Sequence, residues 1–174
     1  MRNTVVMTGI FLAVIPAACA TVGGQHGEHG AHPSGVPTYA EKVSWHTLAE
    51  GREIARSLKK PMIVDFAVPE GCDRCDFLQD NVYNKDEIVE KINADFVPIW
   101  INLDASSHAL TEEEQKLGRK FDYRKDCLLL FLDHEERIVQ DPEGKQFCFA
   151  EEVEPEDFMK YLDYVRTRYV PAGG

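Results

Sequence analysis

The sequence has little positive charge. Its 174 residues include 19 lysines and arginines against 30 aspartates and glutamates, so the formal net charge at pH 7 is -11. Binding to phosphate groups needs clustered basic side chains, and the basic residues here are scattered among more numerous acids. This charge balance argues against nucleic acid as a partner.

The sequence also lacks an apolar run long enough to cross a bilayer, which takes about 20 apolar residues. The apolar stretch from Val5 to about Ala17 is shorter, follows a short basic start and precedes small residues. This layout is typical of a secretory signal peptide. We therefore interpret residues 1–20 as a signal peptide and expect an exported, periplasmic protein without a transmembrane helix.

Cysteine is scarce, and the first of the five cysteines, Cys19, lies in this leader. Residues 18–20, "ACA", fit a small-x-small cleavage site, and cleavage there removes Cys19. Alternatively, "PAAC" resembles a bacterial lipobox, in which Cys19 becomes the lipidated first residue and anchors the protein to a membrane. Pro16 stands where that motif usually has leucine, and both interpretations stay open.

The segment that follows, residues 21–40, is rich in glycine, proline and histidine. Such a segment buries too little surface to order itself, so we interpret it as a flexible linker. His26, His29 and His32 recur at every third position, and imidazoles bind copper, nickel or zinc. A polar spacer is the simpler interpretation, because a mobile segment loses entropy when it gathers metal ligands.

Helix and strand patterns alternate in the rest of the chain. Buried strands are predicted for the apolar runs "MIVDFAV" (62–68), "FVPIWINLD" (96–104) and "CLLLFLD" (127–133). Helix starts are predicted at "TLAE" (47–50), after the second of two close cysteines, at "NKDE" (84–87), at "TEEE" (111–114) and at Pro155. Short strands are predicted for "RIV" (137–139) and "QFCFA" (146–150), on either side of the turn "DPEG" (141–144).

This order of elements predicts an α/β fold with a central mixed sheet and helices on both faces. The length suits one domain, which we place at residues 41–170, followed by a short flexible tail at 171–174.

Two cysteines, Cys72 and Cys75, lie in "DFAVPEGCDRCDF" (65–77). A Cys-x-x-C pair can hold a metal, form a structural disulfide or pass electrons. Here the pair lies in the turn between a predicted central strand and a helix, which is typical of a thioredoxin-like redox motif.

The run from "KKPMIVDF" to "WINLD" (59–104) resembles the thioredoxin superfamily, in particular the branch of exported domains that includes the C-terminal periplasmic domain of the thiol:disulfide interchange protein DsbD. In that branch a strand ending in "VDF" leads to Cys-x-x-C, and further strands end in "N-x-D" and resemble "PTLLFFD". The resemblance extends from about Val43 to Val165, although its last third matches mainly in the order of elements.

The resemblance implies that Cys72 is the exposed nucleophile and Cys75 the resolving thiol, so that the cofactor is their own redox-active disulfide. Physical reasoning agrees, because the N-terminus of a helix stabilises a thiolate and lowers the pKa of a cysteine there. Asp65 matches a buried acid that helps to move the proton of the resolving cysteine. The alternative for Asp65 is an ordinary aspartate at a strand end.

Several positions depart from the family pattern. Gly71 replaces a tryptophan before the first cysteine, and Trp100 replaces a lysine that often accompanies the buried acid. Asp73 and Arg74 are the two residues between the cysteines. The charge of Asp73 disfavours a thiolate and that of Arg74 favours one, so the sequence does not assign the reduction potential.

Cys127 stands where the family has a cis-proline beside the cysteine pair, and Cys148 lies on a neighbouring predicted strand. Three interpretations of these two thiols stay open: inert core residues, a disulfide between them, or thiols that relay electrons or bind a metal.

The leading interpretation is an exported thiol-disulfide oxidoreductase, a reductase or isomerase rather than an oxidase. Its partners are then protein disulfides and a dithiol electron donor, and we expect a monomer. One alternative is a metal-binding module that uses Cys72, Cys75, Cys127 and Cys148, with the three linker histidines as a loading arm. The other is a thioredoxin-like interaction protein that has lost catalysis.

Overall fold

The computed structural model describes residues 33, 36, 42–68, 72–121, 129–145 and 153–169. Within these ranges the elements, in chain order, are α1 (Leu48–Leu58), β1 (Met62–Ala67), α2 (Asp73–Asn81), α3 (Asp86–Asp95), β2 (Val97–Asn102), α4 (Glu112–Phe121), β3 (Leu129–Leu132) and α5 (Pro155–Tyr169). Each lies where the sequence predicts a helix or strand. The predicted signal peptide, most of the linker and the predicted strand at 146–150 lie outside the described residues.

The sheet has the strand order β2-β1-β3, with β1 in the centre. β1 pairs in parallel with β2 and antiparallel with β3, so the sheet is mixed, as predicted. Isolated bridges continue it on both sides, from His46 to Ile99 and from Leu132 to Ile138. The second bridge joins Ile138, in the predicted short strand "RIV", to the end of β3.

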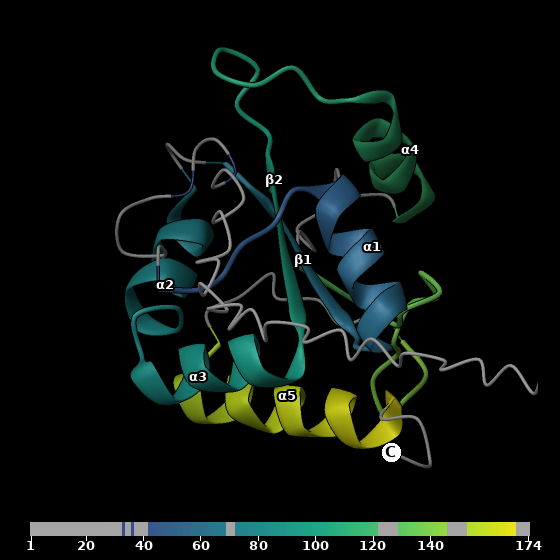
Figure 1. The fold of residues 1–174 in the computed structure, drawn as a ribbon. Helices are drawn as coiled ribbons and strands as arrows, with labels where there is room; N and C mark the ends of the chain where they lie inside the picture. The colour runs from purple at the N-terminus through teal and green to yellow at the C-terminus, as the bar shows by residue number, and fades with distance from the viewer. Residues whose placement is uncertain are drawn as a thin grey trace, which may run out of the picture.

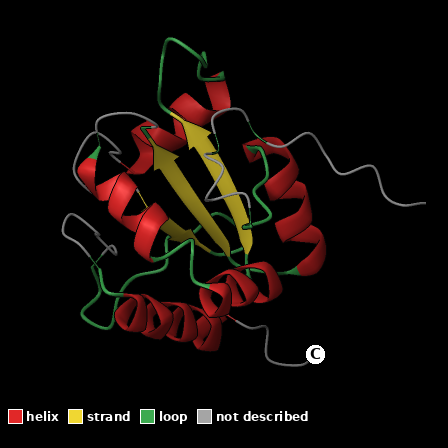
Figure 2. Cartoon of the chain, turned by 90° about the vertical axis from the view of Figure 1, so that its left-hand side faces the viewer, coloured by secondary structure: helices red, strands yellow, loops and turns green. Residues whose placement is uncertain are grey.

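Helices cover both faces of this sheet, with α1 and α4 on one face and α2, α3 and α5 on the other (Figures 1 and 2). Alternate side chains of β1 point to opposite faces, so Met62, Val64 and Phe66 pack with α1 and α4, whereas Ile63 and Ala67 pack with the other three helices. All six residues of β1 and all six of β2 are buried. This two-sided burial explains why both strands are almost continuously apolar.

Two of the three predicted helix caps are confirmed. The Thr47 hydroxyl accepts a hydrogen bond from the backbone N–H of Glu50, and the Glu50 carboxylate accepts one from the Thr47 N–H. Thr111 and Glu114 form the same reciprocal pair at α4. The two capping boxes satisfy backbone N–H groups that the first helical turn leaves without partners.

The third predicted cap, at Asn84, is wrong. The N-cap of α3 is Lys85, and no side-chain hydrogen bond caps that helix. Asn84 instead lies in the turn after α2, which the N–H of Lys85 closes by donating to the carbonyl of Val82. Helix α3 therefore begins one residue later than the sequence predicted, at Asp86.

The turn after β3 is organised by a buried carboxylate, Asp133. Its Oδ1 accepts hydrogen bonds from the backbone N–H groups of Glu135 and Arg137, and its Oδ2 accepts one from Arg137 Nε at 2.6 Å. Burial alone raises the pKa of Asp133, but the hydrogen bonds from Arg137 and Glu135 outweigh it, so the pKa is lower than usual. Asp133 thereby fixes the left-handed turn residue Glu136, whose φ is 62°.

Helix α1 crosses β2 closely at Gly51. A Cβ atom on Gly51 would lie 2.4 Å from Ile99 Cγ1, much closer than two carbon atoms can approach. Glycine therefore sets the distance between this helix and the sheet. In the described part of the chain, no helix is both long and apolar enough to span a membrane.

Candidate active site

The two cysteines of the Cys-x-x-C motif lie at the start of α2, shortly after the central strand β1 ends. Cys72 is the N-cap residue and Cys75 lies in the first turn. The two form a disulfide, with their Cα atoms 5.2 Å apart. The sequence therefore places the pair correctly, because a helix N-terminus after a buried strand is specified by local pattern.

The two sulfurs differ in their surroundings. Cys75 is only 3% exposed, whereas Cys72 is partly exposed. The backbone N–H of Cys75 donates a hydrogen bond to Cys72 Sγ over 3.2 Å. The helix N-terminus therefore stabilises negative charge on the sulfur of the more exposed cysteine.

Acidic residues share the first turn of α2 with this N–H group. Asp73 and Asp76 are both exposed, and the last turn of α2 carries no basic residue. Their negative charges favour the helix but oppose a thiolate on Cys72. Arg74 lies in the same turn, and its side chain is outside the described part of the structure.

Asp65 lies at the middle of the sheet, on the face that α2, α3 and α5 cover. It is 3% exposed, and its Oδ2 accepts a hydrogen bond from the hydroxyl of Tyr83 over 2.7 Å. On the neighbouring strands its partners in register are Trp100 and Leu129. Trp100 is thus located where the resemblance led us to expect it, directly beside the buried acid.

Tyr83 was not identified from the sequence. It follows α2 in the turn that leads to α3, and it is completely buried. Its ring lies edge-on to Trp45 and Phe158. Nothing in its local sequence pattern distinguishes Tyr83 from an ordinary core aromatic, because the hydrogen bond to Asp65 depends on how α2 packs on β1.

Gln79, on α2, is a second polar residue that was not identified from the sequence. It is 2% exposed, and its Oε1 has no hydrogen-bond partner among the described residues. Gln79 lies four positions after Cys75, so both residues are on the inward face of the helix. A buried amide oxygen without a partner destabilises the folded state.

The other predicted site residues lie outside the described ranges: Cys19, Cys127, Cys148, His26, His29 and His32. In the described ranges, no group of three or more His, Cys, Asp or Glu side chains is arranged to hold a metal ion. The interpretations of Cys127 and Cys148 and the metal-binding alternative stay predictions. Elemental analysis of protein prepared without chelator or affinity tag tests the latter.

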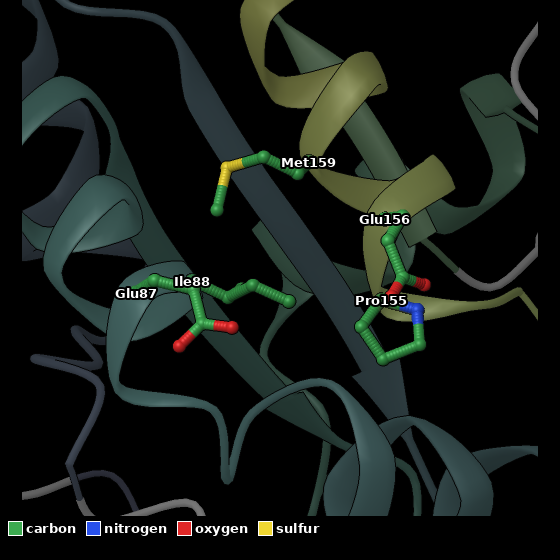
Figure 3. Close-up of a pocket in the computed structure, with 5 residues that line it drawn as sticks. All are labelled: Glu87, Ile88, Pro155, Glu156 and Met159. Carbon is green, nitrogen blue, oxygen red and sulfur yellow. The ribbon is translucent and has the colours of Figure 1, made fainter.

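A surface cavity of about 240 Å³ lies between the N-terminal turns of α3 and α5 (Figure 3). Glu87 and Ile88 line it from α3, and Pro155, Glu156 and Met159 line it from α5. None of these lining residues belongs to α2, so the cavity is separate from the cysteine site. A smaller cavity of about 50 Å³ is lined by Trp100, Asn102, His108 and Glu114, together with Pro33 and Thr47.

No known protein-family model matches the sequence, and a comparison with curated protein sequences finds no match. Solved structures do match. A structure titled DsbH oxidoreductase has 16% sequence identity and a TM-score of 0.55, and the match covers 72% of this chain and 85% of that chain. A thioredoxin from Thermus thermophilus has 21% identity and a TM-score of 0.51, with 76% and 94% covered.

The oxidised C-terminal domain of DsbD from Neisseria meningitidis is also similar, with 15% identity and a TM-score of 0.52 over 68% of this chain and 91% of that domain. Similarity at these identities concerns the fold. It agrees with the mixed sheet and with the helices on both faces, which the sequence predicted. The chain therefore has a thioredoxin-like fold.

Proposed function

We propose that the protein is an exported thiol-disulfide oxidoreductase that acts through Cys72. The observation that carries this proposal is the disulfide at the start of α2, whose two cysteines differ in burial: Cys72 is partly exposed, whereas Cys75 is buried. The thioredoxin-like fold supports it, because the similar structures include a DsbH oxidoreductase and a thioredoxin.

In the reducing direction, the Cys72 thiolate attacks one sulfur of a substrate disulfide. A bond forms between the two sulfurs, the substrate S–S bond breaks, and the departing thiolate takes a proton from solvent. Cys75 then loses its proton and attacks Cys72 Sγ, which forms the intramolecular disulfide and releases the second substrate thiol. Two electrons have passed to the substrate, and a dithiol donor restores the pair.

We propose Asp65 as the group that accepts the proton of Cys75 in the second step. Both side chains are buried, and the residues beside Asp65 on β1, Ile63 and Ala67, pack in one cluster with Leu78 of α2. A carboxylate in such a layer is costly unless it has a partner or a purpose. Asp65 has a hydrogen-bond partner in Tyr83, and acceptance of the Cys75 proton is the function that we propose for it.

The finer assignments follow from analogy of fold and from the leader sequence. We propose reductase or isomerase activity rather than oxidase activity, on protein disulfides, by a monomer in the periplasm. The leader at residues 1–20 supports export, and lipidation of Cys19 remains one of its two outcomes. Globomycin treatment during expression separates the two, because only a lipoprotein precursor accumulates.

Reduction of insulin in the presence of a dithiol tests the activity. We expect turnover by the wild type, none by Cys72→Ser, and covalent capture of substrate by Cys75→Ser, because that variant cannot resolve the mixed disulfide. Asp80→Asn, an exposed change later on α2, serves as the control that keeps wild-type turnover. Equal turnover by the wild type and Cys72→Ser contradicts the proposal.

A further inference from the structure

A buried tyrosine hydroxyl holds the carboxylate that we propose as the proton acceptor. The hydroxyl of Tyr83 donates to Asp65 Oδ2 over 2.7 Å, at 0% exposure for Tyr83 and 3% for Asp65. A hydrogen bond from a neutral donor stabilises the ionised form of a carboxyl group. Where water is excluded, this effect is stronger than at a surface.

The position of the Tyr83 hydroxyl is fixed by packing. The rings of Trp45 and Phe158 both lie edge-on to the ring of Tyr83, with centroid distances of 5.2 Å and 6.3 Å. The backbone N–H of Tyr83 donates to the carbonyl of Leu78, which ties the residue to the end of α2. The hydroxyl therefore reaches Asp65 from the turn that directly follows the helix carrying the cysteines.

Other side chains, some of them charged or titratable, lie on the elements that pack around Asp65. The register neighbours of Asp65, Trp100 and Leu129, are uncharged. Lys91 of α3 forms ion pairs with Asp95 and Asp163. Besides the exposed acids and bases of α2, α3 and α5, the titratable groups described on the packed elements include Cys75 on α2, His46 at the edge bridge, and Tyr161 and Tyr164 on α5.

We propose that Tyr83 is a positioning residue that sets the pH at which Asp65 takes the proton of Cys75, and this inference rests on the proposed function. The hydrogen bond from the hydroxyl to Oδ2 favours the ionised form of the carboxyl group, which is the form that accepts a proton. In the resolving step the Cys75 S–H bond breaks, the proton passes to Asp65, and the Cys75 thiolate attacks Cys72 Sγ. The S–S bond to the substrate breaks, and Asp65 later releases the proton to solvent.

The resolving step can be measured by itself. Reduced protein reacts with Ellman's reagent in two phases, the first releasing one thionitrobenzoate as Cys72 is captured, and the second releasing another as Cys75 closes the disulfide. The rate of the second phase against pH gives the midpoint at which the proton acceptor becomes ionised. In Tyr83→Phe the ring remains and the hydroxyl donor is lost.

We expect Tyr83→Phe to move this midpoint upward by about one pH unit, because loss of the donor disfavours the ionised carboxylate. One unit below the wild-type midpoint, the second phase is then about tenfold slower, and the first phase keeps its rate. Tyr169→Phe, which removes a hydroxyl at the far end of α5, is the matched control and keeps both phases.

A second comparison separates proton transfer from packing. In an Asp65→Asn background, Tyr83→Phe no longer changes the second phase, because no carboxylate is left to respond. If the hydroxyl is merely structural, its loss in Tyr83→Phe instead lowers the free energy of unfolding and leaves the pH midpoint unchanged. Equal midpoints for wild type and Tyr83→Phe overturn the inference but leave the oxidoreductase proposal intact, whereas a missing first phase overturns that proposal.

If Tyr83→Phe does not fold, the wild type labelled with carbon-13 at tyrosine Cζ provides the test. A Tyr83 hydroxyl bonded to Asp65 senses its ionisation, so one tyrosine signal must shift at the midpoint of the second phase and must not shift in Asp65→Asn. The absence of such a signal overturns the inference.

Discussion

Trp100 lies directly beside Asp65 in the parallel pair formed by β1 and β2. By the resemblance to the thioredoxin superfamily, Trp100 replaces a lysine that often accompanies the buried acid, and an indole cannot neutralise a carboxylate. Trp100 is 2% exposed, and its Nε1 has no hydrogen-bond partner in the described ranges. The hydrogen bond described for Asp65 comes instead from Tyr83, a residue of the helical layer.

The first prediction concerns Trp100. Because its Nε1 donates to no described group, Trp100→Phe is expected to leave the pH midpoint of the resolving step unchanged. The smaller ring leaves a void beside Trp45, so the free energy of unfolding falls by about 1 to 3 kcal/mol. Urea unfolding and the second phase with Ellman's reagent measure the two effects, and a shifted midpoint contradicts the view that Trp100 acts through packing alone.

The second prediction concerns the buried amide of Gln79. Gln79→Met keeps the length of the side chain and removes an oxygen that lacks a partner in the part of the chain described, so we expect a gain of about 1 kcal/mol in the free energy of unfolding. Gln140→Met at an exposed position is the control and stays within about 0.5 kcal/mol of wild type. Urea unfolding midpoints provide the measurement, and a loss of stability in Gln79→Met shows that the amide has a favourable role.

The third prediction concerns Asp133 and acid. The pKa of Asp133 is lowered in the folded state, because the hydrogen bonds from Arg137 and Glu135 outweigh the effect of burial. Its contribution is therefore complete above the pKa of the unfolded chain, about 3.9, and is lost as the pH falls through the lower folded-state value.

Asp133→Asn removes this contribution, which we expect to cost about 2 kcal/mol at pH 7 because hydrogen bonds to a buried charged group are lost. Thermal unfolding from pH 7 down to about pH 2 is the measurement. The variant should lose less stability than wild type over this acid range, whereas Asp80→Asn should follow wild type. Parallel curves for Asp133→Asn and wild type refute the assignment.

The fourth prediction concerns the contact of α1 with β2. In Gly51→Ala the new methyl group overlaps Ile99 Cγ1 and Cδ1, so we expect a loss of about 1 to 3 kcal/mol in the free energy of unfolding. Glu53→Ala, on the exposed side of the same helix, controls for the higher helix propensity of alanine. Ile99→Ala removes both atoms, so its combination with Gly51→Ala should cost less than the sum of the two changes; strict additivity contradicts the clash.

The sequence predicted the parts of this molecule that are specified locally. Apolar runs gave the strands, and reciprocal Thr and Glu pairs gave the starts of α1 and α4. The cysteine pair was located in the same way, because a helix N-terminus is a short-range feature. The cap at Asn84 failed, since the turn after α2 takes up one more residue than the pattern suggested.

The relationships that sequence could not supply are those between elements. Tyr83 and Asp65 are 18 positions apart, and their hydrogen bond exists only because α2 packs against β1. Gln79 resembles an ordinary polar helix residue until its burial is known. Both lie in the layer that contains Cys75. The proposed proton transfer therefore depends on contacts between elements, which local sequence patterns do not specify.

The aromatic cluster behind Asp65 has a practical consequence for spectroscopy. Trp45 and Trp100 are the protein's two tryptophans, and their rings lie edge to face with centroids 5.2 Å apart. Trp45 also contacts Tyr83, the residue bonded to Asp65. All tryptophan emission of the native protein therefore arises from one small region beside the buried carboxylate, which gives a label-free optical signal for changes in that region.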